Sequence, residues 1–384
     1  MEPKWVLLND DDFDGYEDGE FTYKGDERYV IIPEKIKGIT ITRTNNFEVT
    51  KGLFTVKNNI IGVAFAKPEN IKSMAYLFHR NTSLKLELAG LVTSSVTDME
   101  SMFRATKSTS LDLSGLDTRN VTNMDSMFRE ASAEELDFKG LDTLNVTDMS
   151  SMFQDSTIRK LFNLTSFNTS NVTTMRSMFS GSKALHLDLT SFDTSKVTTM
   201  QKMFMDSRSG RIDVSSFNTA RVTNMSRMFF NTVVSKLDLN SFDTSNVETM
   251  QEMFRYSRAL GLDVSSFDTR KITDMSNMFR DTSAKILDLR NFNTSNVTDM
   301  SGMFRGCNAE SILFSKDFIT LNVINMSRMF RHTRLKELDL RSFDISNVKD
   351  FTDMFKSAII SIGYARNPIE ADKYNQLLEK KVFS

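Results

Sequence analysis

The sequence predicts an α/β repeat solenoid of about twelve stacked units, here called rungs, each made of a short strand and a helical turn, with the strands in a parallel sheet. Of the 24 Met residues, 22 occupy the two Met positions of the repeat. Pro is absent between Pro68 and Pro368, as a continuous ladder of backbone hydrogen bonds requires. Met-Phe dipeptides recur in steps of 25 residues, twice 26, and end at Phe103, Phe128, Phe153, Phe179, Phe204, Phe229, Phe254, Phe279, Phe304, Phe330 and Phe355.

Two apolar patterns define each rung. The Leu-Asp-Leu sequence at 111–113 alternates with period two, which predicts a short strand whose Asp side chain faces outward. Val121, Met124, Met127 and Phe128 then recur at offsets of 0, 3, 6 and 7 residues, which predicts one apolar face of a helical turn.

Polar positions separate these two patterns. Asn120 precedes the apolar face, where a helix N-cap is expected. The position of Asp117 is filled by Asn in three other rungs, at Asn168, Asn218 and Asn293. Because both side chains accept hydrogen bonds, this exchange predicts an Asx turn rather than a requirement for charge.

We expect three regions along the chain. Residues 1–58 are predicted to form an acidic, β-rich N-terminal capping module, residues 59–358 the solenoid, and residues 359–384 a C-terminal cap. Capping modules are expected because a single rung buries too few apolar side chains to fold alone, and the end rungs would expose apolar surface. The elements predicted in the two caps are strands at 21–23, 29–32, 39–42 and 359–362 and a closing helix from Pro368 to Lys381.

Charge and cysteine content narrow the classes of function. The net charge is −2; residues 1–34 hold eleven acidic and three basic residues, which is −8 and leaves +6 for the rest, so there is no general reason to expect nucleic acid as a partner. The single Cys307 excludes an intramolecular disulfide framework. The opening residues have no signal-peptide pattern and no apolar run is long enough to span a bilayer, so we expect neither classical secretion nor a membrane span.

The sequence does not predict an enzyme or a cofactor. His79, His186 and His332 lie several rungs apart and cannot converge on one metal or one nucleophile. Carboxylates on adjacent rungs could imitate a glycosidase pair, but repeats of nearly constant length leave no insertion to build a cleft. A glycan hydrolase is therefore kept only as a remote alternative.

The outward position of each strand predicts an acidic stripe and the first candidate site. Like charges about 5 Å apart repel, and we expect their counter-charges to be the Arg residues that follow the terminal Phe (Arg104, Arg129, Arg255, Arg280, Arg305 and Arg331). A structural ladder, a partner-binding face and bound cations are all open interpretations. The acidic members are Glu87, Asp112, Asp137, Asp188, Asp213, Asp238, Asp263, Asp288 and Asp339, with Asn163 and Phe314 assigned to the two remaining positions.

A second candidate site lies near the N-terminus. Asp10, Asp12, Asp14 and Gly15 have the spacing of the first half of a calcium-binding loop. The twelfth position is Phe21 instead of the expected Glu. Two interpretations of this segment therefore stay open, a calcium-binding loop and a solvated acidic turn.

The repeats resemble the BspA-type leucine-rich repeats of bacterial surface proteins, which also occur in Mycoplasma-type surface lipoproteins and in phage-encoded proteins. The residues that carry this resemblance are LDLNSFDTSNVETMQEMF at 237–254, LDLRNFNTSNVTDMSGMF at 287–304 and the two flanking segments at 21–42 and 362–378. The resemblance implies a leucine-rich-repeat-like solenoid with a role in adhesion or partner recognition and no catalytic residues to transfer.

These observations give one leading hypothesis of function and an alternative. The leading one is a nonenzymatic adhesion or receptor-binding protein on a phage virion or bacterial surface, made in the cytoplasm and recognising a cell-surface protein or glycan. The alternative is a virion or assembly component that packs against copies of itself or neighbouring virion proteins. Specificity is expected where the rungs differ, as after each terminal Phe at 107–109, 182–184, 208–210 and 334–336.

Overall fold

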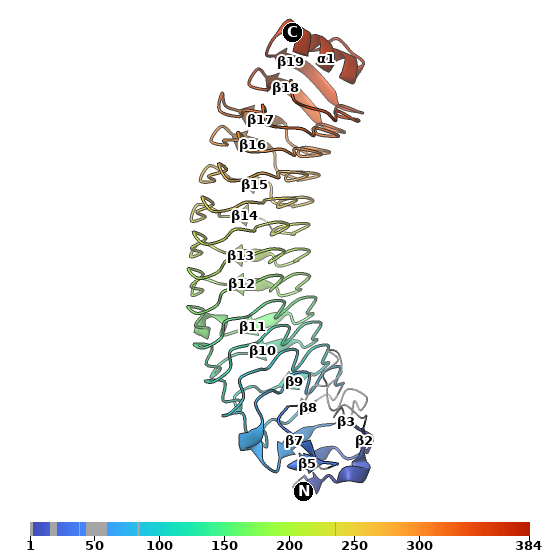
Figure 1. The fold of residues 1–384 in the computed structure, drawn as a ribbon, viewed down its shortest axis with the longest axis vertical. Helices are drawn as coiled ribbons and strands as arrows, with labels where there is room; N and C mark the ends of the chain where they lie inside the picture. Colours follow the sequence, from blue (N-terminus) through green and yellow to red (C-terminus); the bar gives the residue numbers. More distant parts are fainter. Residues whose placement is uncertain (1–2, 16–20, 38, 44–59, 83–84, 235) are drawn as a thin grey trace. The chain divides into compact units, whose positions relative to one another are not determined.

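The computed structural model describes residues 3–15, 21–37, 39–43, 60–82, 85–234 and 236–384, and divides into two compact units, Met1–Asp193 and Thr194–Ser384 (Figure 1). Each unit is a parallel-strand β-solenoid. The predicted boundary at residue 58 lies outside the described residues.

The first unit begins with a small sheet that leads into the rungs. Strands β1, β4 and β7 pair in parallel, with Val30 opposite both Val6 and Val63, while β2–β3 and β5–β6 form antiparallel pairs. Strands are thus found at the predicted positions 21–23 and 29–32, and at 39–40. Its elements are β1 (Val6–Leu7), η1 (Asp10–Asp12), β2 (Phe13–Gly15), β3 (Phe21–Tyr23), β4 (Tyr29–Ile32), β5 (Lys35–Ile36), β6 (Ile39–Thr40), β7 (Gly62–Phe65), η2 (Pro68–Asn70), β8 (Lys85–Leu86), β9 (Ser110–Leu111), β10 (Glu135–Asp137), β11 (Lys160–Phe162), η3 (Leu164–Ser166) and β12 (His186–Asp188).

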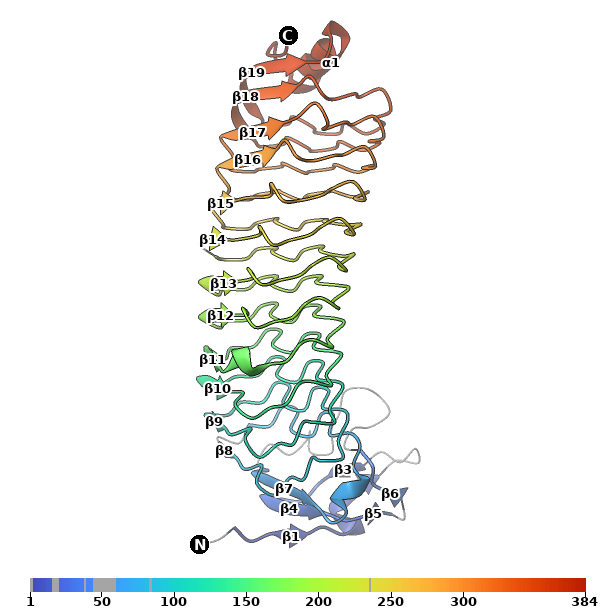
Figure 2. The same cartoon turned by 90° about the vertical axis from the view of Figure 1, so that its left-hand side faces the viewer.

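The second unit continues the repeat and contains one α-helix. Strands β14–β15, β16–β17 and β18–β19 pair in parallel. In Figure 2 the strands β13 to β17 lie one above another along the same side of their rungs. The elements of this unit are β13 (Arg211–Asp213), β14 (Lys236–Leu237), β15 (Gly261–Leu262), β16 (Ile286–Leu289), β17 (Ser311–Phe314), β18 (Arg334–Leu340), β19 (Ile359–Ala365) and α1 (Pro368–Leu378).

Helix α1 starts at Pro368 and ends at Leu378, short of the predicted Lys381. The side chain of Asn367 caps it by accepting the N–H of Glu370. Tyr374 is buried against Phe355 and Phe383. That this segment acts as a helical cap stays a prediction.

The predicted helical turns are wrong. The Met-Phe segments are chains of β-turns. Their N–H groups donate alternately to carbonyls of the same rung and of the next rung. In one rung Met102 donates to Met99 O at 3.2 Å, within the rung, whereas Phe103 donates to Met127 O at 2.9 Å, in the next rung. Two residues per rung, such as Ser101 (φ 52°) and Ala105 (φ 55°), adopt positive φ, as the third residue of a type II turn requires.

The N-cap interpretation of Asn120 is also wrong, because no helix follows it. Its amide donates to Ser94 O of the preceding rung at 2.8 Å. Asn145, Asn171, Asn246, Asn296, Asn322 and Asn347 make the same kind of bond to the rung before them. The predicted Asx turn at Asp117 is confirmed, since its Oδ1 accepts the N–H of Arg119 at 3.2 Å.

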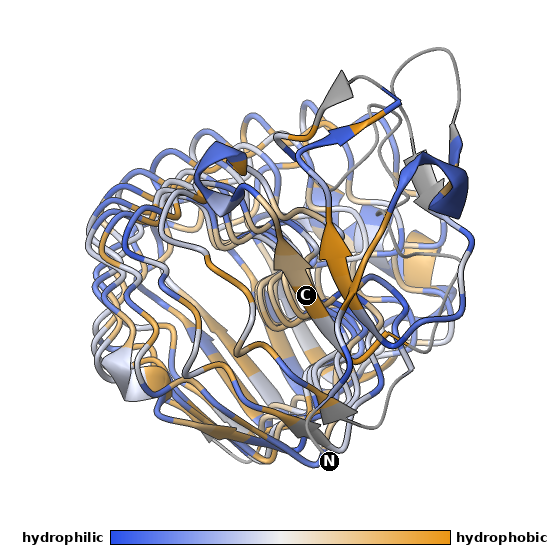
Figure 3. Cartoon of the chain, turned by 90° about the horizontal axis from the view of Figure 1, so that it is seen from below, coloured by the Kyte–Doolittle hydropathy of each residue, from blue (hydrophilic) through white to orange (hydrophobic). Residues whose placement is uncertain are grey.

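The core of each unit is a set of apolar columns parallel to the stack. The Val, Met, Met and Phe positions are fully buried in nearly every rung. The Phe rings stack with their neighbours, as Phe254 does on Phe229 and on Phe279, with centroids 5.8 Å apart in both pairs. In Figure 3 hydrophilic colours predominate at the outer corners of the rungs.

A column of buried Thr hydroxyls runs beside the apolar core. The Oγ1 of Thr244 donates to Asp268 O at 2.9 Å and accepts the Asp268 N–H at 2.8 Å. This side chain is 1% exposed. The hydroxyl donation to the next rung recurs at Thr93, Thr118, Thr143, Thr169, Thr194, Thr219, Thr269, Thr294 and Thr320.

Candidate functional site

The predicted acidic stripe is built into the backbone of each rung. Every one of its Asp side chains uses Oδ1 to accept the N–H two residues further on, at 2.9–3.2 Å, and so forms the Asx turn that ends the strand. These residues are Asp112, Asp137, Asp188, Asp213, Asp238, Asp263, Asp288 and Asp339.

Hydrogen bonds lower the pKa of six of these carboxyl groups, those of Asp112, Asp137, Asp213, Asp263, Asp288 and Asp339. Bonds from Ser265 lower the pKa of Asp263, and bonds from the guanidinium of Arg341 lower the pKa of Asp339. Because one carboxylate oxygen is bonded to the backbone in each of these eight rungs, the stripe is in the first place a structural feature of the rungs. The ligand-binding role assigned to it stays a prediction.

The stripe is interrupted twice, and not by the residues predicted. Phe162 lies beside Asp137, and Leu313 lies beside Asp288, so these two apolar residues take the outward positions instead of Asn163 and Phe314. Both interruptions fall in the 26-residue steps, where the additional residue follows the strand. Counting back from the terminal Phe therefore shifted the predicted strand position by one.

The predicted counter-charges lie elsewhere. Arg104 pairs with Glu130 and Arg331 with Asp353, both on the face formed by the β-turn chains. The arginines that do pair with the stripe are two residues from their own Asp. They are Arg211 with Asp213, Arg290 with Asp288 and Arg341 with Asp339.

The N-terminal carboxylates each have a protein partner. Asp10 accepts the N–H of Lys37 at 2.6 Å, Asp12 accepts the N–H of Asn9 at 2.8 Å, and Asp14 pairs with Lys24 at 3.3 Å. Within the described ranges, no three His, Cys, Asp or Glu side chains are grouped as metal ligands. Calcium binding here stays a prediction.

The other reactive side chains do not converge. His79 is buried in the first unit, His186 is exposed at the start of β12, and His332 follows a Met-Phe segment of the second unit. Burial raises the pKa of the Cys307 thiol to about 12, so the thiol is neutral at pH 7. In the part of the chain that the structure describes, no helix has the length and apolarity to cross a membrane.

Burial disfavours the ionised form of one carboxyl group of the first unit, that of Asp125. Burial raises the pKa of Asp125 to about 6, with smaller upward contributions from the carboxylates of Asp148 and Glu100 and a downward one from the hydrogen bond of Ser126. The folded state therefore binds a proton below about pH 6, whereas the unfolded chain does so only near pH 4.

We expect the free energy of unfolding to rise as the pH falls from 7.5 to 5, because the folded state takes up the Asp125 proton first. Asp125→Asn should raise the stability at pH 7.5 by about 1 kcal/mol, a value reduced for partial exposure, and lose this advantage at pH 5. Urea unfolding at both pH values measures the difference. Asp117→Asn is the control, since hydrogen bonds from Arg119 lower the pKa of Asp117; an equal gain there would contradict the prediction.

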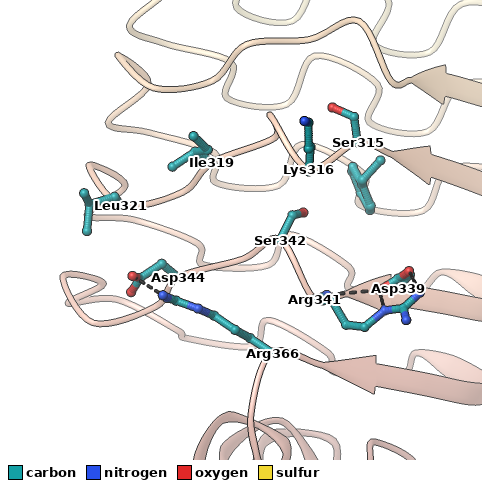
Figure 4. A pocket seen from close by; sticks show the side chains of 10 residues that line it. Ser315, Lys316, Ile319, Leu321, Asp339, Arg341, Ser342, Asp344 and Arg366 are labelled. Carbon is teal, nitrogen blue, oxygen red and sulfur yellow. Dashed lines mark hydrogen bonds and ion pairs between the residues drawn. The ribbon is translucent and has the colours of Figure 1, made fainter.

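A groove in the second unit is the strongest candidate for a ligand site. It has a volume of about 590 Å³ and is formed by successive segments after β17, β18 and β19 (Figure 4). The rung at 311–325 replaces the usual Asp, Ser and Thr residues with apolar and basic ones. The lining residues are Phe314, Ser315, Lys316, Ile319, Leu321, Asp339, Arg341, Ser342, Asp344 and Arg366.

The groove combines apolar and charged groups. Ile319 and Leu321 are 40% and 46% exposed, although their side chains are apolar. Arg366 pairs with Asp344, and hydrogen bonds from Ser346 and then Arg366 lower the pKa of that carboxyl to about 2. Lys316 has no ion pair among the described residues. An amphipathic ligand with an acidic group would find both kinds of contact here.

One departure from the repeat marks this groove in the sequence. Variation was expected after each terminal Phe, and a smaller hollow of about 340 Å³ does include Lys107, Ser108 and Thr109 of that position in the first unit. The larger groove instead follows the strand, where one rung departs from the repeat at several positions together.

Comparisons with known proteins agree with a repeat protein. A family model described as "Mycoplasma protein of unknown function, DUF285" matches residues 50–161, 158–260, 230–312 and 287–361. No curated protein matches the sequence.

Two solved structures are similar at low identity. The functional domain of InlJ from Listeria monocytogenes is 13% identical with a TM-score of 0.44, and the match covers 86% of this chain and 65% of that one. A leucine-rich repeat protein from Bacteroides ovatus is 11% identical with a TM-score of 0.30, covering 99% of this chain and 91% of that one. This chain thus spans slightly less than two thirds of the InlJ domain.

Proposed function

This chain belongs to the family described as "Mycoplasma protein of unknown function, DUF285", and we propose that it is a nonenzymatic binding protein that recognises a cell-surface protein or glycan. The observation that carries the proposal is the groove of the second unit. The recurring Asn and Thr side chains hold neighbouring rungs together and the recurring Asp side chains form turns within a rung, whereas the groove also presents Lys316, Ile319 and Leu321, which depart from the repeat.

The chemistry of the groove supports binding rather than catalysis. Ile319 and Leu321 offer apolar contact, and Lys316 offers a cation with no carboxylate partner among the described residues. Exposed apolar groups next to charged ones are typical of recognition surfaces. We place the protein on a virion or bacterial surface, a proposal that the neighbouring genes would test, since tail or capsid genes beside its own would support the virion.

The experiment is a binding assay of the labelled full chain on bacterial cells and isolated wall fragments. We expect the double variant Ile319→Asp with Leu321→Asp to bind at least tenfold more weakly, because charges replace the apolar contacts while the core is untouched. The matched control is Leu260→Asp with Ile286→Asp. Those residues are 62% and 58% exposed in the same unit and line no part of the groove.

The outcomes separate the proposals. Equal loss in both double variants, or binding by neither the native chain nor the variants, would contradict recognition through the groove. Self-association without binding to cells would favour the structural virion or assembly component. Release of soluble sugar from the wall fragments would revive the glycan hydrolase.

A further inference from the structure

Five consecutive rungs of the second unit carry a basic residue at one position of the β-turn chain. We call this set the arginine row; it consists of Arg255, Arg280, Arg305, Arg331 and Lys356. Each of their carbonyls accepts an N–H from the preceding rung at 2.7–3.0 Å, the donors being Asn231, Tyr256, Asp281, Gly306 and His332. The five residues are therefore in register at the spacing of parallel strands, about 4.8 Å per rung.

Carboxylates compensate the arginine row everywhere except at its centre. Glu252 pairs with Arg255 at 2.6 Å, Asp281 pairs with Arg280 at 3.1 Å, and Asp353 pairs with Arg331 at 2.6 Å and with Lys356 at 3.4 Å. Within the described residues Arg305 has no such partner. In its own rung the two positions of positive φ are Gly302 and Gly306, which provide no side chain to pair with it.

The surroundings of Arg305 are consequently rich in positive charge. Arg227, which pairs with Glu252, and Arg328 add two further cations beside the arginine row on the same β-turn face. Burial and the charges of Arg280 and Arg331 lower the pKa of Arg305. An anion placed on this line would relieve the repulsion between neighbouring guanidinium groups.

We propose that the arginine row binds a linear anionic glycan that runs along the stack of rungs. A linear polymer fits because the cations repeat along one line across five rungs. A glycan is favoured because hydroxyl and amide groups, those of Gln251, Ser301 and Ser327, lie four residues before the basic residue of their own rung and can bind sugar hydroxyls. The Tyr256 ring lies under the Arg255 guanidinium at 4.9 Å and supports that cation in the row.

This site uses none of the groove residues, so it goes beyond the proposed function and can fail independently of it. The test is equilibrium binding of the full chain to polygalacturonate and to dextran sulfate, with neutral dextran as the reference. We expect binding to at least one of the anionic polymers, weakened at least tenfold when salt rises from 50 to 200 mM, because charge pairing dominates.

Variants at Arg305 locate the site. Arg305→Gln should weaken binding at least fivefold, and Arg305→Lys should retain most of it; neither leaves a carboxylate without its partner. Arg208→Gln is the matched control, because Arg208 is an exposed arginine of the same unit outside the arginine row. This substitution removes the same charge as Arg305→Gln. Unchanged thermal unfolding of Arg305→Gln establishes that the fold is intact.

Three outcomes would overturn the proposal. They are failure to bind either anionic glycan, an equal loss in Arg208→Gln and Arg305→Gln, and tighter binding of polyglutamate or single-stranded polythymidylate than of both glycans. The last of these would assign the arginine row to an acidic polypeptide or a nucleic acid.

Discussion

Replacing Phe254 by alanine is expected to lower the free energy of unfolding by about 4 kcal/mol, the largest single effect on stability that we predict. Phe254 is fully buried, and its ring is stacked between Phe229 and Phe279. Removing it leaves a cavity and exposes the facing surfaces of two neighbouring rings. Because each rung packs only on its neighbours, the adjoining rungs lose support with it.

Urea unfolding of Phe254→Ala measures this loss. The matched control is Phe254→Leu, which keeps most of the volume and should cost only about 1–1.5 kcal/mol. Hydrogen exchange should show lost amide protection around residues 229–279 first. A loss below 2 kcal/mol for the alanine variant would mean that the Phe column is not a main source of stability.

Replacing Thr244 by valine is expected to cost about 2–4 kcal/mol, although the two side chains have nearly the same shape. The hydroxyl of Thr244 bonds both the C=O and the N–H of Asp268, and valine would leave these two backbone groups without it. Because the site is buried, water cannot replace the lost bonds without opening the stack.

The same unfolding measurement tests this prediction against two controls. Thr244→Ser keeps the hydroxyl and should cost about 1 kcal/mol for the lost methyl group. Thr298→Val removes an exposed hydroxyl that also bonds a backbone carbonyl, Thr273 O at 3.2 Å, and should change stability by less than 0.5 kcal/mol. If the two valine variants behaved alike, the buried hydroxyl column would have no special role.

The sequence predicted the repeat, the short strands and the identity of the core. It did so because apolar side chains such as Met253 and Phe254 must be buried wherever the local backbone goes. The prediction of helical turns was wrong for the same reason. Offsets of 0, 3, 6 and 7 residues satisfy one face of a helix and equally satisfy a chain of β-turns, so side-chain spacing could not decide between hydrogen bonds within a rung and hydrogen bonds between rungs.

Backbone conformation was the information missing from the sequence. Positive φ is adopted by Gly302, where it is expected, but equally by Lys202, Arg227 and Glu252, which give no local sign of it. These residues are held there by the ladder between rungs. The Thr column was similarly hidden, because a repeated Thr next to a repeated Asp looks like an ordinary surface turn.

The candidate site was predicted only in part. The eight Asp residues of the acidic stripe lie in the strands or directly after them, whereas its two interruptions were predicted one residue too late. The hydrogen bonds of the stripe to the backbone depend on the turn that follows and could not be read from Leu-Asp-Leu alone. The groove needs three segments brought together, including Arg366 from beyond the repeats. Four members of the arginine row, Arg255, Arg280, Arg305 and Arg331, were predicted as counter-charges of the acidic stripe, whereas three of them pair with carboxylates of the β-turn face.

The nearly constant number of residues between hydrogen-bonded partners has a consequence for the gene. The amide of Asn145 reaches the rung before it, as does that of Asn296, and in each case the partner lies 26 residues earlier, while Thr122 and Thr298 reach back 25. Unequal recombination that removes or inserts one whole repeat would therefore rejoin the backbone donors and the Thr hydroxyls to acceptors of the same type. The length of such a protein can change between generations by 25 codons at a time without the loss of a single class of contact.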